Sequence, residues 1–377
     1  MEEKTFVFGT AAEGENFTDR VKETKRLTAN FTHGINTILI SPRRWGKTSL
    51  VKHVINTLQE PDIKLIYIDI FSCRNPEEFY SRFAEAVIKQ TSSKYDELIE
   101  NIKSFLQRFN PKFKMSSGSD IELSLTLEIT PKAEDEWEIL EIPEKIALKK
   151  KCRIVVCIDE FQQIGEFPDS LNFQKRLRTV WQHQQQTSYC LFGSKKHLMS
   201  ELFAASSMPF YKFGDIIFLN KIPESDWIPY ILSRFRDSGK EISEELAADI
   251  CCKIENQSNY VQQLSWILWV NTDKEATREA LEESFNELVN HNSLLFERMT
   301  ENLTAPQLNF LRAITEGVHN GFTKKDILVK YQLGTSSNIK RLKESLLQKD
   351  LIDIESGEVM IPDPVFRQWL IRSVFNR

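Results

Sequence analysis

The sequence predicts an α/β fold, in which helices cover both faces of a parallel sheet, followed by an all-α region and a C-terminal winged helix-turn-helix. Three observations predict it. Short continuous apolar runs alternate with amphipathic segments up to about residue 220. One run leads through a Gly-Lys-Thr turn into a helix, and a later run ends in two consecutive carboxylates. Beyond residue 220, helical periodicity replaces the apolar runs. Continuous apolar runs are typical of strands buried on both faces of a parallel sheet.

The first part of the chain supplies the strands and helices of this sheet. Each predicted strand is a short apolar run bounded by polar or turn residues, and each helix shows an apolar stripe at the helical period. The strands are expected at Ile35–Ile40, Ile63–Phe71, Ile154–Ile158, Ser188–Phe192 and Ile216–Leu219, and the helices at Thr48–Leu58, Pro76–Lys89 and Leu171–Gln185.

Residues from about 92 to 150 interrupt the alternation and are interpreted as an insertion in the core. Phe113–Met115 and Ile121–Ile129 are expected to form a β-hairpin, because apolar and polar residues alternate along the second segment. Trp137–Lys151 is expected to be one helix with a basic end. The hairpin is either an arm that contacts a partner or an ordinary half-exposed ladder.

The rest of the chain divides into two helical parts. We expect the core to span residues 1–220, a helical lid 221–297 and a winged helix domain 298–377. In the last part, three helices precede two short extended pieces, which is the plan of a winged helix-turn-helix. The expected helices are Glu224–Asp237, Ser243–Glu255, Val261–Asn271, Glu275–Glu297, Thr304–Glu316, Lys324–Tyr331 and Thr335–Lys349, and the extended pieces are Ile352–Ile354 and Val359–Ile361.

Composition excludes some classes of protein. The net charge is −5, so a chain-wide basic field for nucleic acid is absent, although a local basic face is compatible with it. No apolar run reaches the length of a membrane-spanning helix, and the acidic N-terminus is unlike a signal peptide. The six cysteines form no Cys-x-x-Cys pair, which favours buried reduced thiols and a cytoplasmic location.

The turn between the first strand and its helix resembles a phosphate-binding loop. It matches the Walker A pattern at Gly46, Lys47 and Thr48, with Ser41 where the first glycine is usual. Backbone N–H groups of such a loop wrap a phosphate, the lysine reaches the β- and γ-phosphates, and the threonine hydroxyl ligates Mg²⁺. The alternative is a basic loop that only caps a helix. The residues expected to bind ATP here are Ser41, Pro42, Arg43, Arg44, Trp45, Gly46, Lys47, Thr48 and Ser49.

A second signal comes from the strand that ends in Asp159 and Glu160. The carboxyl ends of parallel strands are where α/β sheets hold ligands, so Asp159 is expected to hold the Mg²⁺ shell and Glu160 to act as general base on water. Ser194 closes the next strand and either contacts the γ-phosphate region or forms a simple turn. Asp69 could face the same edge, but a turn cap after its strand is favoured.

These motifs resemble the AAA+ NTPases and, more closely, the STAND-like archaeal-type ATPases. The resemblance spans nearly the whole chain. It implies that Phe17 and Arg20 of an N-terminal F-x-x-R-x-x-E box lie beside the adenine, and that Lys47, Glu160 and Ser194 serve catalysis. The matching segments are Phe17–Arg20, the loop SPRRWGKTSL, Ile158–Gln162, Phe192–Ser194, Pro209–Tyr211, Tyr260–Leu264, and Asp363–Phe366 with Trp369.

The sequence departs from the family's pattern in two places. The lid's usual Gly-x-Pro is replaced by Asn256-Gln257-Ser258, which puts nucleotide sensing through that turn in doubt. No arginine occurs between Arg178 and Arg234, where a ring-forming relative would carry its arginine finger. An arginine finger accelerates hydrolysis greatly, so its absence predicts slow turnover and a switch-like role, unless Arg176 or Arg178 substitutes.

The winged helix could carry the partner site. Thr335–Lys349 is the candidate recognition helix, with Lys340, Arg341 and Lys343 as candidate contacts to duplex DNA. The alternative, which is weighted equally, is a module that docks a protein or autoinhibits the chain, with its charges solvated. We therefore expect an Mg²⁺-dependent, ATP-hydrolysing switch that couples nucleotide state to a DNA or protein partner, with homo-oligomerisation left open. The alternatives are a DNA-acting initiator or transposition-type regulator, and a non-catalytic nucleotide-bound scaffold for a defence effector, defence being an association of the family only.

Overall fold

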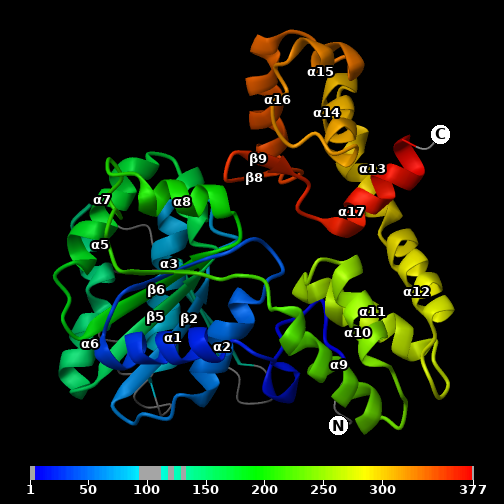
Figure 1. The fold of residues 1–377 in the computed structure, drawn as a ribbon. Helices are drawn as coiled ribbons and strands as arrows, with labels where there is room; N and C mark the ends of the chain where they lie inside the picture. Colours follow the sequence, from blue (N-terminus) through cyan, green and yellow to red (C-terminus); the bar gives the residue numbers. More distant parts are fainter. Residues whose placement is uncertain (1–4, 93–111, 118–122, 129–132, 376–377) are drawn as a thin grey trace. The chain divides into compact units, whose positions relative to one another are not determined.

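The computed structural model describes residues 5–92, 112–117, 123–128 and 133–375. The chain forms two compact units (Figure 1). One unit is Ala11–Asn220, and the other combines Met1–Thr10 with Lys221–Arg377. The chain therefore passes between the units twice, once after Thr10 and once after Asn220.

The first unit contains the predicted parallel sheet. Its five strands lie in the order β2-β5-β6-β1-β7 and are all parallel. The predicted α/β fold with a parallel sheet is therefore confirmed. β6 separates β1 from β5, so the end of β6 lies between the ends of the two strands that carry the sequence motifs. The bounds are β1 Thr37–Ile40, β2 Ile63–Asp69, β5 Arg153–Asp159, β6 Thr187–Gly193 and β7 Asp215–Phe218.

Alternate residues of each strand enter two different apolar clusters, because successive side chains of a strand point to opposite faces. Leu39 packs with α1 and α2 on one face, whereas Ile38 and Ile40 pack into the other cluster. Helices thus cover both faces of the sheet, as continuous apolar strands require (Figure 1). The helices on the first face are α1 Val21–His33 and α2 Lys47–Thr57, and those on the second include α3 Pro76–Thr91, α7 Ser170–Trp181 and α8 Lys196–Ala204.

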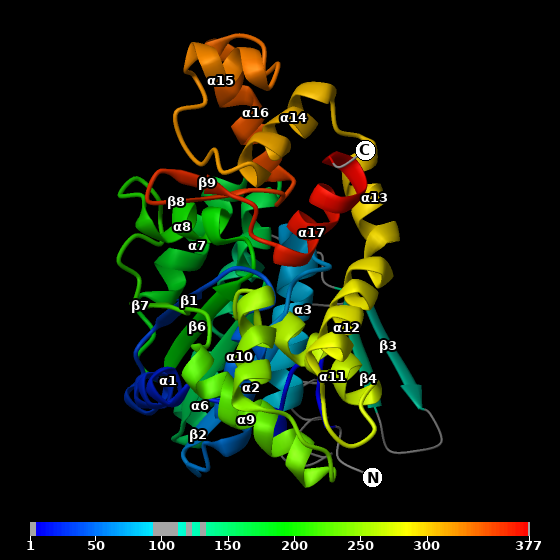
Figure 2. The same cartoon turned by 45° about the vertical axis from the view of Figure 1, so that its right-hand side comes forward.

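The insertion differs from its prediction in one respect. β3 (Lys112–Ser117) and β4 (Leu123–Glu128) form the expected antiparallel ladder (Figure 2), while residues 121, 122 and 129 lie outside the described residues. The single helix predicted at Trp137–Lys151 is wrong, because α5 (Ala133–Leu140) ends before a second helix, α6 (Ile142–Lys150), begins. Pro143 sits in the first turn of α6, where its missing N–H costs nothing but where it ends the preceding helix.

The second unit contains the helices expected to form the lid and the elements of the winged helix. The helix predicted at Glu275–Glu297 is two helices, which are separated by a tight turn at Asn292. The backbone N–H of Asn292 donates to the Val289 carbonyl oxygen in this turn. The winged helix plan is confirmed, with three helices followed by an antiparallel two-stranded ladder. The elements are α9 Glu224–Asp237, α10 Glu244–Lys253, α11 Ser258–Val270, α12 Arg278–His291, α13 Ser293–Glu301, α14 Ala305–Thr315, α15 Lys325–Lys330, α16 Ser336–Gln348, β8 Asp353–Glu355, β9 Glu358–Met360, α17 Pro364–Trp369 and the π-helical turn η3 Leu370–Phe375.

Among the described residues, three α-helices were not predicted, namely α1, α8 and α17. α17 is short and is fixed by its cap, since the Asp363 carboxylate accepts from the N–H groups of Val365 and Phe366. Five of the six cysteines are buried as predicted, whereas Cys252 is exposed, and all six are free thiols. No helix among the described residues is long and apolar enough to cross a membrane.

Candidate functional site

The loop after β1 is shaped by two left-handed residues. Arg44 has φ of 66° and Gly46 has φ of 89°. Glycine adopts this backbone without the steric cost that a Cβ imposes, so the glycine at 46 allows α2 to begin abruptly at Lys47. The Leu50 amide donates to the Gly46 carbonyl at 2.9 Å, which closes the first turn of α2. The loop therefore directs the N-terminus of α2 toward the carboxyl edge of the sheet.

Lys47 is buried beneath this loop. Its Nζ donates to the carbonyl oxygens of Ser41 at 3.1 Å and Pro42 at 3.0 Å. Burial lowers the pKa of Lys47 to about 8, against the attraction of Asp159 and Glu160, which raises it. The lysine thus places a desolvated positive charge under the loop, which favours a nearby anion.

Thr48 and Asp159 meet at the start of α2 and the end of β5. The Thr48 hydroxyl donates to Oδ2 of Asp159 at 2.9 Å, and the Tyr67 hydroxyl donates to the same oxygen at 2.8 Å. The other carboxylate oxygen, Oδ1, accepts from the Glu160 backbone N–H at 2.8 Å. Burial raises the pKa of Asp159, while its hydrogen bonds with Tyr67 and Thr48 lower it. A cation at this position would relieve the cost of burying the carboxylate.

Glu160 lies at the turn after β5 with φ of 55°. Its Oε2 accepts from the Ser194 hydroxyl at 2.9 Å and from the amide nitrogen of Gln162. Ser194 also accepts from Nε of Arg43 at 3.3 Å. β6 runs between β1 and β5, so Ser194 at the end of β6 lies between the loop and Glu160. Its hydroxyl contacts Arg43 on one side and Glu160 on the other, in addition to any part that it has in the turn.

The N-terminal box supports the loop from outside. Arg20 is 2% exposed, and its NH2 group donates to the Trp45 carbonyl oxygen at 2.9 Å. Phe17 stacks on His53 of α2, with ring centroids 4.0 Å apart. The Ser49 hydroxyl accepts from the Ala12 N–H at 2.9 Å. Arg20 therefore buttresses the loop backbone, and Ser49 ties α2 to the chain's N-terminal segment.

The structure brings together Ser41, Pro42, Arg43, Lys47, Thr48, Asp159, Glu160 and Ser194 through these hydrogen bonds. The side chain of Arg44 is exposed. Asp69 accepts from the Phe71 N–H at 2.8 Å, so the predicted turn cap is confirmed.

Two residues of the site were missed by sequence reasoning, Tyr67 and Gln162. Tyr67 lies on the same strand face as Asp69, and this pattern could have indicated that Tyr67 faces the site. Its contact with Asp159, however, depends on β2 lying beside β5. Gln162 is 3% exposed and lies so close to Gly193 that a Cβ there would come within 1.8 Å of its Oε1. The contact of Tyr67 with Asp159 and the approach of Gln162 to Gly193 cannot be inferred without the strand order.

The two arginines considered as substitutes for an arginine finger have partners within the core. Arg176 forms an ion pair with Glu136, and Arg178 lies over the Phe213 ring at 4.8 Å from its centroid. Both side chains are thus held by their own unit.

On α16, the predicted candidate contacts differ in exposure. Lys340 and Arg341 are exposed, whereas Lys343 is half-buried with Nζ 5.3 Å from the centroid of Phe322. Lys340 approaches Glu344 at 3.9 Å, an exposed pair that restrains it little. The exposed positive charge of the helix is therefore concentrated at Lys340 and Arg341.

The residues at the sheet edge fit a magnesium nucleotide. Thr48 and Asp159 offer a hydroxyl and a carboxylate oxygen 2.9 Å apart, and Mg²⁺ prefers oxygen ligands of this kind. Lys47 and the N-terminus of α2 supply positive charge on the phosphate side.

Comparisons with known proteins agree with this arrangement. The chain resembles the Walker-type ATPase PABY2304 of Pyrococcus abyssi at 17% identity, covering 98% of this chain and 100% of that one with a TM-score of 0.67. It also resembles the Aeropyrum pernix ORC2 protein at 15% identity, covering 99% and 96% with a TM-score of 0.60. At these identities the likeness shows the fold. The sequence comparison with curated proteins gave no match.

Two family models match the sequence. Residues 294–372 match a model described as "probable winged helix domain". Residues 17–210, which contain the loop, Asp159, Glu160 and Ser194, match the model of an ATPase domain found predominantly in Archaea. This match covers just over half of the chain, and the chain belongs to this family of P-loop ATPase domains.

Proposed function

We propose that this protein binds and slowly hydrolyses ATP with Mg²⁺ and uses the nucleotide state to switch its lid and winged helix. The observation that carries the proposal is the constellation at the carboxyl edge of the sheet. Lys47, the Thr48–Asp159 pair and the Ser194–Glu160 pair lie around the N-terminus of one helix. The ORC2 neighbour was solved in ADPNP-ADP complexes, which agrees with a nucleotide at this fold's site.

Each side chain has a step that it can perform. Lys47 would turn from the carbonyl oxygens of Ser41 and Pro42 to the phosphates, where its positive charge would neutralise part of their negative charge. Glu160 would accept a proton from the attacking water, with Ser194 holding its Oε2. Bound Mg²⁺ would supply charge neutralisation at the phosphates, with Thr48 and Asp159 as the residues that hold it.

Slow turnover is part of the proposal. The sequence has no arginine between Arg178 and Arg234. Arg176 and Arg178 already have partners in Glu136 and Phe213. Without an arginine finger from this part of the chain, the transition state would lack a stabilisation worth several orders of magnitude in rate.

The N-terminal segment offers a route from the loop to the lid. On one side, Ala12 is bonded to Ser49, the residue after Thr48. On the other, the Gly9 N–H donates to Asn259 and the Val7 N–H donates to Gln262, both on α11. Only two residues separate these anchors, so a shift of α2 on nucleotide binding would pull directly on the lid helix. This short tether supports coupling between the phosphate site and the lid.

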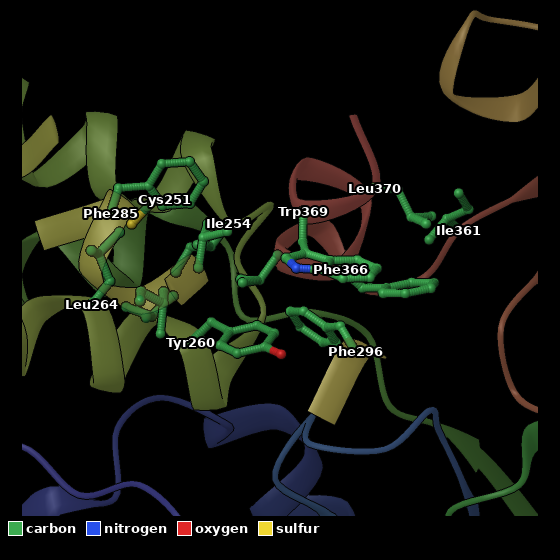
Figure 3. Packing of buried hydrophobic residues seen from close by; sticks show 14 of the residues in the cluster. Cys251, Ile254, Tyr260, Leu264, Phe285, Phe296, Ile361, Phe366, Trp369 and Leu370 are labelled. Atoms are coloured by element: carbon green, nitrogen blue, oxygen red, sulfur yellow. The ribbon is translucent and has the colours of Figure 1, made fainter. Parts of the chain in front are cut away.

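The lid and winged helix are expected to move as one body. Glu255, at the lid turn, pairs with Arg367 of α17 and with Lys221 at 3.4 Å. The Tyr260 hydroxyl donates to Asp363 at 2.8 Å. One apolar cluster runs through both parts, with Tyr260, Phe296, Phe366 and Trp369 close together (Figure 3). We accordingly propose the division 1–220, 221–297 and 298–377, changed only in that Met1–Thr10 belongs with the second unit, and we propose that the last two parts act together.

Movement can be measured with spin labels. Cys252 is the exposed cysteine of the chain and lies in the lid unit. Lys175→Cys would add an exposed site on α7 of the core. Pulsed double electron–electron resonance should show different distance distributions in the ADP state and in the state with Mg²⁺ and ATP. The ATP state is measured in Glu160→Gln, so that the ATP is not hydrolysed. Identical distributions in the two states would refute the switch while leaving ATP binding intact, and Cys252→Ser controls for labelling elsewhere.

The partner is proposed to be duplex DNA or a protein bound by α16. A charge reversal decides between them. If DNA is the partner, Lys340→Glu with Arg341→Glu should weaken binding of a fluorescent duplex and reduce its salt dependence. Reversing exposed Lys25 and Lys175 of the core is the matched control, with the same change in net charge. If both double variants bind the duplex as the wild type does, or if the wild type binds none, α16 is left as a site that docks a protein. The alternative of a non-catalytic scaffold for a defence effector would then also remain.

A further inference from the structure

We propose that Tyr67 is a positioning residue for the metal site, holding the Asp159 carboxylate in the orientation that a hydrated Mg²⁺ needs. The inference rests on the proposed function and adds a residue that no motif contains. Tyr67 lies on β2, next to β5 in the sheet. Its hydroxyl donates to Oδ2 of Asp159 at 2.8 Å.

The register of the two strands explains how Tyr67 reaches the carboxylate. Asp69 is paired with Asp159, and Tyr67 with Cys157. Tyr67 therefore lies on the same face as Asp159 but one pleat away, a diagonal distance that a long aromatic side chain spans. A shorter side chain at 67 would not reach, and Asp69, which lies level with Asp159, is used as a turn cap instead.

The tyrosine is itself fixed by neighbours. Gln90 of α3 brackets its backbone, because the amide nitrogen of Gln90 donates to the Tyr67 carbonyl at 2.9 Å and the Tyr67 N–H donates to Gln90 Oε1 at 2.9 Å. The ring lies near Phe192, with centroids 6.4 Å apart, and Nζ of Lys52 lies 5.7 Å from its centroid. Burial and the Asp159 charge raise the pKa of Tyr67, so the phenol remains a donor at neutral pH.

Tyr67 is a second donor to an oxygen that Thr48 also contacts. The Thr48 hydroxyl donates to the same Oδ2 at 2.9 Å. A threonine oxygen that ligates Mg²⁺ through a lone pair would keep its O–H for Asp159, so Tyr67 and Thr48 would hold Oδ2 together, Tyr67 from the side of β2. Oδ1 is held throughout by the Glu160 N–H at 2.8 Å. With both oxygens fixed, the remaining lone pairs of Asp159 would be oriented to accept hydrogen bonds from water molecules on a bound Mg²⁺.

The test is Tyr67→Phe, which removes one hydroxyl and keeps the ring. The affinity for ATP is measured with Mg²⁺ and again in EDTA, and the ratio is taken within each variant, so that a loss of folded protein cancels. The ratio should fall about tenfold in Tyr67→Phe, the usual effect of losing a hydrogen bond to a charged group, while the affinity in EDTA stays unchanged. The concentration of Mg²⁺ that half-saturates turnover should rise by a similar factor.

Tyr189→Phe is the matched control. Its hydroxyl is also buried, but it donates to Gln184 at 2.7 Å, away from Asp159. The control should keep the wild-type ratio even if its thermal stability falls. An unchanged ratio in Tyr67→Phe, or an equal fall in both variants, would overturn the positioning role and leave the ATPase proposal standing. A wild-type protein whose ATP affinity ignores Mg²⁺ would overturn both.

Discussion

At the scale of single residues, Lys47 is a side chain whose pKa burial and neighbouring charges shift in opposite directions. Burial lowers its pKa to about 8. Bound phosphates would raise that pKa again, because they favour the ammonium form. Lys47 should therefore take up a proton when nucleotide binds above about pH 8, where the free lysine is largely neutral. Below that pH the lysine is already protonated and no uptake is expected.

The expected pH dependence follows from that sign. The affinity for ADP in EDTA should be nearly constant from neutral pH to about pH 8 and should fall by up to about tenfold per pH unit above it. Calorimetric titration across this range measures the slope. Lys47→Arg keeps a positive charge that does not titrate, so its affinity, even if weaker, should show no such slope. The same slope in both proteins would show that another group is responsible.

Arg20 gives a second prediction at this scale. Its guanidinium is 2% exposed and holds the Trp45 carbonyl at 2.9 Å and Glu23 at 3.4 Å. Arg20→Ala should lower the free energy of unfolding of the core by about 2–4 kcal/mol, because a buried acceptor loses a charged donor. Urea unfolding of the nucleotide-free protein measures this.

The control for Arg20 is Arg74→Ala, since Arg74 pairs with Glu78 on the exposed start of α3. It should unfold like the wild type. If Arg20→Ala also unfolds like the wild type, Arg20 acts on the nucleotide directly and not through the loop.

At the scale of elements, the turn at Glu255–Asn256 is one of the strained turns of the second unit. Glu255 and Asn256 both have positive φ, 51° and 56°, although neither is glycine. Asn256 stands where the first residue of the family's Gly-x-Pro is expected, and Glu255 precedes it. Burial raises the pKa of Glu255, but its hydrogen bond to Arg367 and the attraction of Arg367 and Lys221 outweigh this, so its pKa lies below the usual value. The ion pairs thus compensate the strain of the turn.

Arg367→Ala tests this compensation. Removing the arginine leaves Glu255 with Lys221 and should destabilise the second unit by about 1–2 kcal/mol, measured by urea unfolding. Because the pKa of Glu255 is lowered, the ion pair stabilises the fold above about pH 4.5 and is lost as pH falls. The difference between variant and wild type should therefore shrink in acid. Arg278→Ala, at an exposed pair with Glu245, should change neither value.

The sequence predicted those strands, helices and site residues that are marked by a pattern within a single stretch of chain. Asp159 and Glu160 were predicted because they end an apolar run, and every strand of the sheet was found in the same way. The break at Asn292 was missed because the apolar period continues across it. The break at Glu141 has a local signal in Pro143, but the apolar period across it favoured a single helix. Tyr67 was missed because its role depends on which strands are neighbours, and a sequence period does not give strand order. Gln162 was missed because its contact with Glu160 depends on the short 3-10 helix Phe161–Glu166 that follows β5.

At the scale of the whole molecule, the chain is two compact units joined at Thr10–Ala11 and Asn220–Lys221. The first joint follows the anchors on α11, and the second precedes Lys221, which pairs with Glu255. Both joints thus end on the lid. This arrangement suits a switch in which one unit holds the nucleotide and the other presents α16 to a partner.

The measurement that tests the central claim most directly is steady-state ATP hydrolysis with Mg²⁺ by the wild type, Glu160→Gln and the control Glu166→Gln, with and without duplex DNA. Glu166 is an exposed carboxylate paired with Lys195, so its loss should not matter. We predict slow turnover in the wild type and in Glu166→Gln, and none in Glu160→Gln, which should still bind ATP. Equal turnover in all three proteins, or none in the wild type despite ATP binding, would contradict hydrolysis at this site.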